Sequence, residues 1–199
     1  GHRLARYVRK DFKTGQFQGE VIVPRKFLNI ITTYIPNDEP IQLWLGNNVF
    51  TATIGADTIY TRIIDERFPD YQSVIPTDNE KEIKVSCKNL LSAVKRVSIF
   101  SNKSTHQIAI RVESGSATVT TEDPEKASKA QETIEIEYAG DPIDVGYNAA
   151  YLEDILSHMN SNEIVIKLNT PISAGLFYPT PPNDNVDVTM LLMPIRLND

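Results

Sequence analysis

Cysteine is nearly absent from this sequence: Cys87 is the only one in 199 residues. A single thiol cannot form an internal disulfide, and such scarcity is typical of the reducing cytoplasm. No run of 18 apolar residues occurs, which excludes a helix that spans a bilayer. The first residues, 1–6, contain no apolar stretch of the kind found in a signal peptide. We therefore expect a cytoplasmic protein.

The motifs of common enzyme classes are also missing. The sequence has no glycine-rich phosphate loop and no Gly-x-Ser-x-Gly turn. Its histidines, His2, His106 and His158, are far apart and show no metal-ligand spacing with Cys87. The acidic stretch 122–125 lies among lysines, and we interpret it as a solvated hairpin connection. We expect no metal, no cofactor and no catalytic residue; a dispersed carboxylate pair is the enzymatic alternative.

The net charge is −6, which taken alone argues against binding to nucleic acid. The charges are unevenly distributed, however. Residues 1–100 hold 14 Lys and Arg against 11 Asp and Glu, whereas residues 101–199 hold 6 against 15. Because the field at a surface follows nearby charges more than the total, the first half can still attract phosphate.

Three segments share one pattern, at residues 21–31, 83–91 and 143–152. Each begins with the apolar–x–apolar alternation of a short strand, passes a turn or cap residue and enters a helical pattern. The turn or cap residues are Pro24, Ser86 and Gly146. Each helix has one apolar face. These faces consist of Phe27, Leu28, Ile30, Ile31, Tyr34 and Ile35; of Leu90, Leu91, Val94 and Val97; and of Tyr151, Leu152, Ile155, Leu156 and Met159.

Three further strand-like runs follow each helix. They cover residues 41–45, 49–54 and 58–64; 108–112, 117–121 and 133–138; and 164–168, 173–178 and 186–193. A strand–helix–strand–strand–strand unit that recurs three times predicts a modular α+β architecture; the alternative is a coincidence of short patterns. The proline-bounded connector 67–76 predicts a boundary between a domain at 1–76 and one at 77–199, the latter built of two repeats at about 77–138 and 139–197. We interpret the first 20 residues as the tail of a preceding copy.

Several stretches, in this order and spacing, resemble the bacterial sliding clamp, the beta subunit of DNA polymerase III. They are GHRLA (1–5), VIVPRK (21–26), RFPDYQSVIP (67–76), NAAYLEDIL (148–156) and MPIRL (193–197). The resemblance implies a clamp fold in which two subunits form a homodimeric ring, with helices lining the pore and antiparallel sheets outside. The chain would then hold the second half of the middle domain and the whole C-terminal domain, without the N-terminal part.

The function implied by the resemblance is processivity: the ring encircles duplex DNA, slides, and tethers the polymerase without catalysing a reaction. Such a ring needs weak, sequence-independent attraction to phosphates. The basic residues expected to face DNA are Arg25, Lys26, Lys88, Lys95 and Arg96. The alternative for the last three is an ordinary solvated helix face. The third helix carries no Lys or Arg and is expected to contribute little.

The resemblance also implies a hydrophobic pocket that binds short peptides of clients such as the DNA polymerase III alpha subunit and the clamp loader. Its expected residues are Gly1, His2, Arg3, Leu4, Pro69, Val74, Asn148, Tyr151, Ile172, Ala174, Leu191, Leu192, Met193, Pro194, Ile195, Arg196 and Leu197. Pro194 ends the last strand because it lacks an N–H donor. Met193 is then a flexible wall, and Arg196 can bind a client's carbonyl or carboxylate groups. The competing hypothesis is a peptide-binding module that does not act on DNA.

Overall fold

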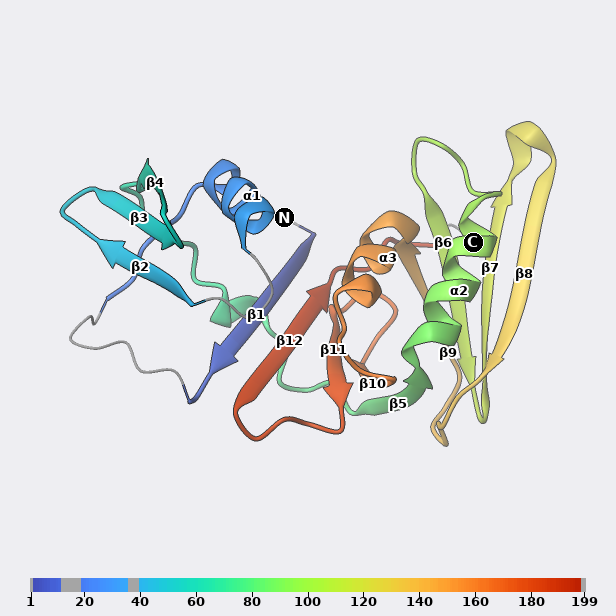
Figure 1. Cartoon of the computed structure of the whole chain (residues 1–199). Helices are drawn as coiled ribbons and strands as arrows, with labels where there is room; N and C mark the ends of the chain where they lie inside the picture. Colours follow the sequence, from blue (N-terminus) through green and yellow to red (C-terminus); the bar gives the residue numbers. More distant parts are fainter. Residues whose placement is uncertain (1, 12–18, 36–39, 198–199) are drawn as a thin grey trace. The chain divides into compact units, whose positions relative to one another are not determined.

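The computed structural model describes residues 2–11, 19–35 and 40–197. In these residues the chain forms helices and antiparallel strands in alternating groups (Figure 1). The helices are α1 (Arg25–Tyr34), α2 (Cys87–Ser98) and α3 (Ala149–Ser157), with short 3₁₀ turns η1 (Gln72–Val74) and η2 (Pro124–Lys126). The strands are β1 (Arg3–Arg9), β2 (Ile41–Leu45), β3 (Val49–Ile54), β4 (Asp57–Arg62), β5 (Lys81–Ser86), β6 (Gln107–Glu113), β7 (Ser116–Asp123), β8 (Ser128–Glu135), β9 (Ile143–Asn148), β10 (Glu163–Leu168), β11 (Gly175–Thr180) and β12 (Val186–Leu192).

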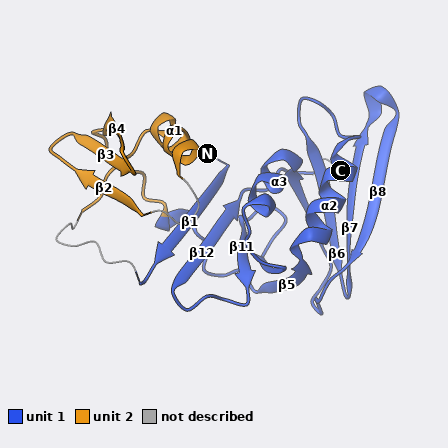
Figure 2. Cartoon of the chain, in the orientation of Figure 1, with its two compact units in different colours: residues 1–12, 72–199 blue, residues 13–71 orange. Residues whose placement is uncertain are grey.

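The chain divides into two compact units (Figure 2). The larger unit consists of residues 1–12 and 72–199, and the smaller one of residues 13–71. Strand β1 belongs to the larger unit because it pairs along its whole length with β12. None of the helices in the described part of either unit has the length and apolarity needed to cross a membrane.

The smaller unit packs α1 against the sheet β2-β3-β4. Phe27 and Ile31 lie one helical turn apart, so both side chains reach the same face of the sheet and are buried. Phe27 meets Phe50 edge to face, with ring centroids 5.7 Å apart. The strand predicted at 21–23 is wrong: only Ile22 pairs, in an isolated bridge with Ile64.

The larger unit contains the sheets β1-β12-β11-β10-β5 and β8-β7-β6-β9, all of whose pairs are antiparallel. The two repeats exchange their first strands: β5 pairs with β10 of the other repeat, and β9 pairs with β6. Residues 21–23 have no such neighbouring strand among the described residues of their unit, which explains the missing first strand there. The exchange places α2 and α3 side by side over one shared core.

Isolated bridges join the two sheets at equivalent points of the repeats. Lys84 in β5 pairs with Glu137, just beyond β8, and Gly146 in β9 pairs with Ile195, just beyond β12. Both helices begin at a capping side chain: Ser86 Oγ accepts a hydrogen bond from the Asn89 N–H at 3.3 Å, and the Asn148 side chain caps α3. The pattern of elements within the larger unit is thus repeated, as the sequence suggested.

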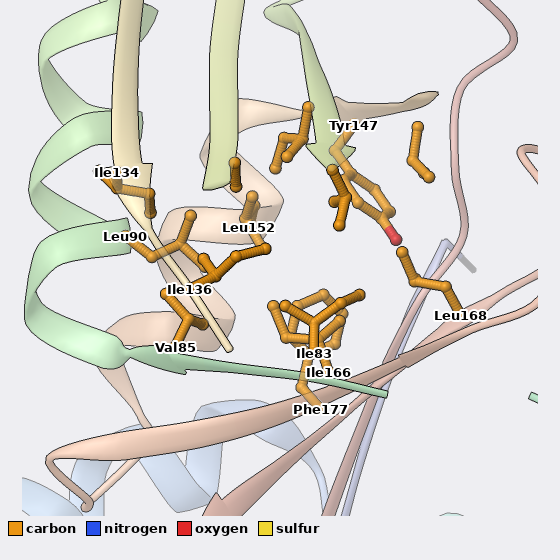
Figure 3. Close-up of a pocket in the computed structure, with 14 residues that line it drawn as sticks. Ile83, Val85, Leu90, Ile134, Ile136, Tyr147, Leu152, Ile166, Leu168 and Phe177 are labelled. Atoms are coloured by element: carbon orange, nitrogen blue, oxygen red, sulfur yellow. The ribbon is translucent and has the colours of Figure 1, made fainter. Parts of the chain in front are cut away.

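The core of the larger unit encloses a small apolar cavity of about 30 Å³ (Figure 3). The aromatic ring of Tyr147 lines this cavity, and its hydroxyl points toward Leu168. No described residue hydrogen-bonds to that buried hydroxyl. Burial raises the pKa of Tyr147, so the phenol stays neutral.

Candidate functional site

A second, smaller group of apolar side chains lies on the five-stranded sheet opposite the main core. We call it the outer apolar cluster; it consists of the buried Ala174, Leu176 and Leu191 with the partly buried Leu4, Ile75 and Tyr178 packed against them. Leu4 faces Leu191 across the β1–β12 pair, and Leu191 faces Leu176 across the β11–β12 pair. Strand alternation puts these side chains on one face, while Phe177 and Leu192 point into the main core.

Large apolar side chains adjoin this cluster along the chain and remain exposed. Val74 is 55% exposed, Ile172 59% and Met193 39%. Each is next or close in sequence to a cluster member, namely Ile75, Ala174 or Leu191. Segments that are far apart in the sequence therefore meet in the outer apolar cluster, and each of three of them also carries an exposed apolar side chain.

The C-terminal tail leaves this surface and pairs with a different strand. β12 ends at Leu192, and Pro194 follows; the Met193 N–H donates to the His2 carbonyl at 2.8 Å. The Ile195 N–H then donates to the Gly146 carbonyl of β9 at 2.8 Å. Arg196 is exposed and Leu197 is half-buried. Backbone hydrogen bonds thus attach the tail to His2 through Met193 and to β9 through Ile195.

A separate group of aromatic and charged side chains lies where β1 meets α3, and strand alternation puts Arg3 on the sheet face opposite the outer apolar cluster. The His2 ring stacks on Tyr151 with centroids 6.3 Å apart, and the Arg3 guanidinium carbon lies 4.5 Å from the Tyr151 ring centroid. Asp154, one turn further along α3, forms an ion pair with Arg3, with 2.8 Å between Asp154 Oδ2 and Arg3 Nη1. Asn148 begins the helix, since its Oδ1 accepts the Tyr151 N–H at 3.2 Å. An aromatic ring and a cation are therefore held together here.

Of the expected pocket residues, the structure places Leu4, Ala174 and Leu191 in the outer apolar cluster, and it contradicts the expectation for Leu192. Leu192 has none of its surface exposed and belongs to the main core, because neighbouring residues of a strand point to opposite faces. Gly1 lies outside the described residues, and Pro69 belongs to the smaller unit. Four residues of these two groups were not predicted from the sequence: Ile75, Leu176, Tyr178 and Asp154. The alternation 174, 176, 178 was a usable signal for two of these, whereas nothing local pairs Asp154 with Arg3.

The basic residues expected to face DNA differ in their surroundings. On α2, Arg96 Nε donates to Glu132 Oε2 of β8 at 2.8 Å, and this hydrogen bond lowers the pKa of Glu132. Lys88 and Lys95 are exposed on the same helix and make no ion pair with any residue that the structure describes. Their charges remain available to a ligand, while that of Arg96 is partly neutralised.

In the smaller unit, Arg25 and Lys26 occupy the exposed first turn of α1. The acids of α3 are engaged: Glu153 accepts the Ser98 hydroxyl at 2.9 Å, and Asp154 is held by Arg3. No three His, Cys, Asp or Glu side chains gather as metal ligands in the described ranges.

Two family models together match nearly the whole chain. The family model of the DNA polymerase III beta subunit, C-terminal domain, matches residues 72–196, and that of its central domain matches residues 1–70. The chain belongs to the DNA polymerase III beta subunit family. The beta sliding clamp of Pseudomonas aeruginosa is 30% identical over 198 residues, which are 99% of this chain and 53% of that protein. That of Vibrio cholerae serotype O1 is 26% identical over 201 residues, again 99% and 53%.

Solved structures of the beta subunit family agree with the fold. A crystal structure of the P. aeruginosa sliding clamp has a TM-score of 0.90 at 29% identity and covers 99% of this chain and 53% of its own. A Bartonella birtlesii clamp bound to griselimycin has a TM-score of 0.89 at 28% identity, with 98% and 52% covered. The predicted α+β clamp fold is confirmed. The chain spans about half the length of the curated relatives it matches.

Proposed function

We propose that this chain forms part of a sliding clamp, a non-catalytic processivity factor that encircles duplex DNA in the bacterial cytoplasm. Its clients, the DNA polymerase III alpha subunit and the clamp loader among them, bind through short peptides. Family membership and the confirmed clamp fold support the proposal. The observation that carries the client-binding part is the outer apolar cluster, together with the exposed apolar side chains of Val74, Ile172 and Met193 that follow or precede its members in the chain.

Two features suit this surface to a peptide. Apolar side chains give a small interface most of its affinity, and a few fixed polar groups set the orientation of the ligand. Met193 adds a flexible, polarizable side chain that adapts to different anchors. Sliding clamps from P. aeruginosa and B. birtlesii have been solved bound to griselimycin. We infer that griselimycin and client peptides use the outer apolar cluster and its exposed neighbours.

The homodimer is proposed to close at β8. Strand β12 ends its repeat, and its outer edge is paired with β1. β8 is the equivalent strand of the preceding repeat, yet no strand among the described residues pairs with its outer edge. Ile99 and Phe100 lie nearby, 65% and 46% exposed, with the Ser128 hydroxyl donating to the Phe100 carbonyl at 3.2 Å. An open edge with exposed apolar side chains favours pairing with a second subunit.

DNA binding is proposed to depend on Arg25, Lys26, Lys88 and Lys95, with Arg96 contributing less because of Glu132. These lysines and arginines lie on exposed helical turns, where they can contact DNA phosphates whatever the base sequence. Contacts of this kind are weak and depend on salt, as sliding requires.

The client-binding proposal is tested by griselimycin titration of Leu4→Ala. Removing this partly buried leucine should weaken binding by about 1–3 kcal/mol, roughly 5- to 150-fold. Leu28→Ala is the matched control, because Leu28 is an exposed leucine of α1 in the smaller unit; it should bind like the parent. Parent-like affinity of Leu4→Ala, measured calorimetrically well below its melting temperature, would contradict the proposed site.

A further inference from the structure

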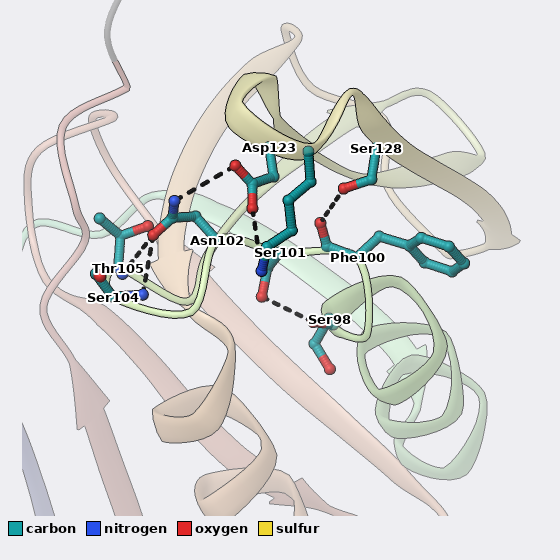
Figure 4. A network of polar contacts seen from close by, with 9 residues as sticks. Ser98, Phe100, Ser101, Asn102, Ser104, Thr105, Asp123 and Ser128 are labelled. Atoms are coloured by element: carbon teal, nitrogen blue, oxygen red, sulfur yellow. Dashed lines mark hydrogen bonds and ion pairs between the residues drawn. The ribbon is translucent and has the colours of Figure 1, made fainter.

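Asp123 is a buried carboxylate where the sequence predicted a solvated hairpin. It ends β7, and only 1% of its surface is exposed. Its Oδ1 accepts a hydrogen bond from Asn102 Nδ2 at 3.4 Å, and its Oδ2 lies 3.8 Å from the Lys126 ammonium (Figure 4). No described residue hydrogen-bonds to Oδ2. A buried polar side chain with so few partners costs folding free energy, so its presence calls for a reason other than stability.

Asn102 connects this carboxylate to the loop 102–106. Its Oδ1 accepts the N–H of Ser104 at 2.9 Å and that of Thr105 at 3.3 Å, which forms an Asx turn. Its carbonyl accepts the His106 N–H at 2.9 Å. Both ends of the Asn102 amide are therefore used, and Asp123 fixes the orientation of the amide that shapes the loop (Figure 4).

The far end of the loop holds the start of α3. The Thr105 carbonyl accepts Asn148 Nδ2 at 3.1 Å, and the His106 carbonyl accepts the Ala149 N–H at 2.8 Å. With its Nδ2 fixed in this way, Asn148 presents Oδ1 to the Tyr151 N–H. A continuous path of hydrogen bonds and backbone thus leads from Asp123 to the residue that carries the stacked Arg3.

We propose that Asp123 and Asn102 are positioning residues for the client-binding site. They set the loop 102–106, the loop orients Asn148, and Asn148 fixes the first turn of α3 with Tyr151. The inference rests on the proposed function, since Asn148 and Tyr151 are taken as the residues that meet the client. Asp123 itself lies too deep to touch a ligand.

The test measures griselimycin affinity and the hydrogen-exchange protection of the Tyr151 N–H, both well below the melting temperature. Asn102→Ala should weaken binding about three- to tenfold and lower that protection. Asn148→Ala should do the same, and the double variant should bind no worse than Asn148→Ala, because both changes break one path. Asp123→Asn keeps an acceptor oxygen for Asn102 and should stay close to the parent in both readouts.

Asn183→Ala is the matched control. Asn183 forms the same kind of turn, accepting the Asn185 N–H at 2.9 Å, in the connection between β11 and β12. It should change neither readout. Parent-like affinity and protection in Asn102→Ala, or losses that add fully in the double variant, would overturn the proposal. If the parent itself binds no griselimycin, the proposed function fails, and Tyr151 protection alone then decides the positioning role.

Discussion

Gly146→Ala should detach the C-terminal tail without changing any residue of the outer apolar cluster. A methyl group on Gly146 would lie 2.5 Å from the Ile195 carbonyl oxygen and 2.7 Å from Leu197 Cδ2. Both distances are too short for real contacts, and the oxygen belongs to backbone that cannot rotate away. The tail must therefore move off β9, losing the Ile195 N–H···Gly146 hydrogen bond.

The expected loss of stability is small. The hydrogen bond contributes about 0.5–1.5 kcal/mol, and the two half-buried side chains of Ile195 and Leu197 contribute roughly 1 kcal/mol each. Ordering the three residues 195–197 costs about 3–5 kcal/mol of conformational entropy, so docking of the tail is nearly balanced. Gly146→Ala should thus lower the free energy of unfolding by about 1 kcal/mol or less. Griselimycin affinity should fall up to about fivefold, because the contribution of the docked tail to the site is lost.

Urea unfolding and calorimetric titration measure the two effects, and a truncated background tests their cause. In a chain that lacks residues 195–199, the methyl group has nothing to collide with. There, Gly146→Ala should alter neither stability nor affinity, and the truncation alone should reproduce the loss of affinity. An equal effect of Gly146→Ala with and without the tail would refute the steric argument.

Two further predictions concern the core and the charges proposed to face DNA. Tyr147→Phe removes a buried hydroxyl to which no described residue hydrogen-bonds, and it should raise the free energy of unfolding by about 1 kcal/mol in urea unfolding. The new methyl group of Gly175→Ala would collide with that hydroxyl, so Gly175→Ala should lower the free energy of unfolding clearly less in the Tyr147→Phe background than in the parent. An equal loss in both backgrounds would disprove the clash. In an assembled clamp, Lys95→Ala should reduce the slope of log affinity for DNA against log salt by about 0.9, whereas Arg96→Ala should change it less at neutral pH. Because Arg96 holds the pKa of Glu132 below its ordinary value, the ion pair persists at neutral pH and is lost as the pH falls through that pKa. Equal salt slopes for Lys95→Ala and Arg96→Ala at neutral pH would contradict this pairing.

The helices could be located from the sequence because their burial is periodic. Phe27 and Ile31, or Leu90, Val94 and Val97, recur at helical spacing, and the structure buries these positions. The last strand of the repeat at about 77–138 was predicted at 133–138, yet β8 begins at residue 128. Its first half alternates Lys129 and Gln131 with small or polar neighbours, so its apolar signal is weak.

Features that depend on distant pairing could not be predicted. Nothing local shows that β5 pairs with β10 or β9 with β6, because partners 31 to 87 residues apart leave no shared period. Asp123 looked solvated since its neighbours are charged, and only the fold reveals the loop that covers it. The candidate site shows the same division: resemblance suggested Leu4 and Arg3, but the packing of Leu4 with Leu176 and the ion pair of Arg3 with Asp154 emerged only from the structure.

The exchange of first strands has a consequence for how the larger unit folds. Neither repeat can complete its sheet alone, so each resembles one half of a domain-swapped pair whose halves are joined covalently. Two separate copies would have to meet in solution, whereas the short connection from β8 to β9 keeps the second copy at a high effective concentration beside the first. Formation of either sheet then requires both repeats, so we expect the two repeats of the larger unit to fold and unfold together in one cooperative transition.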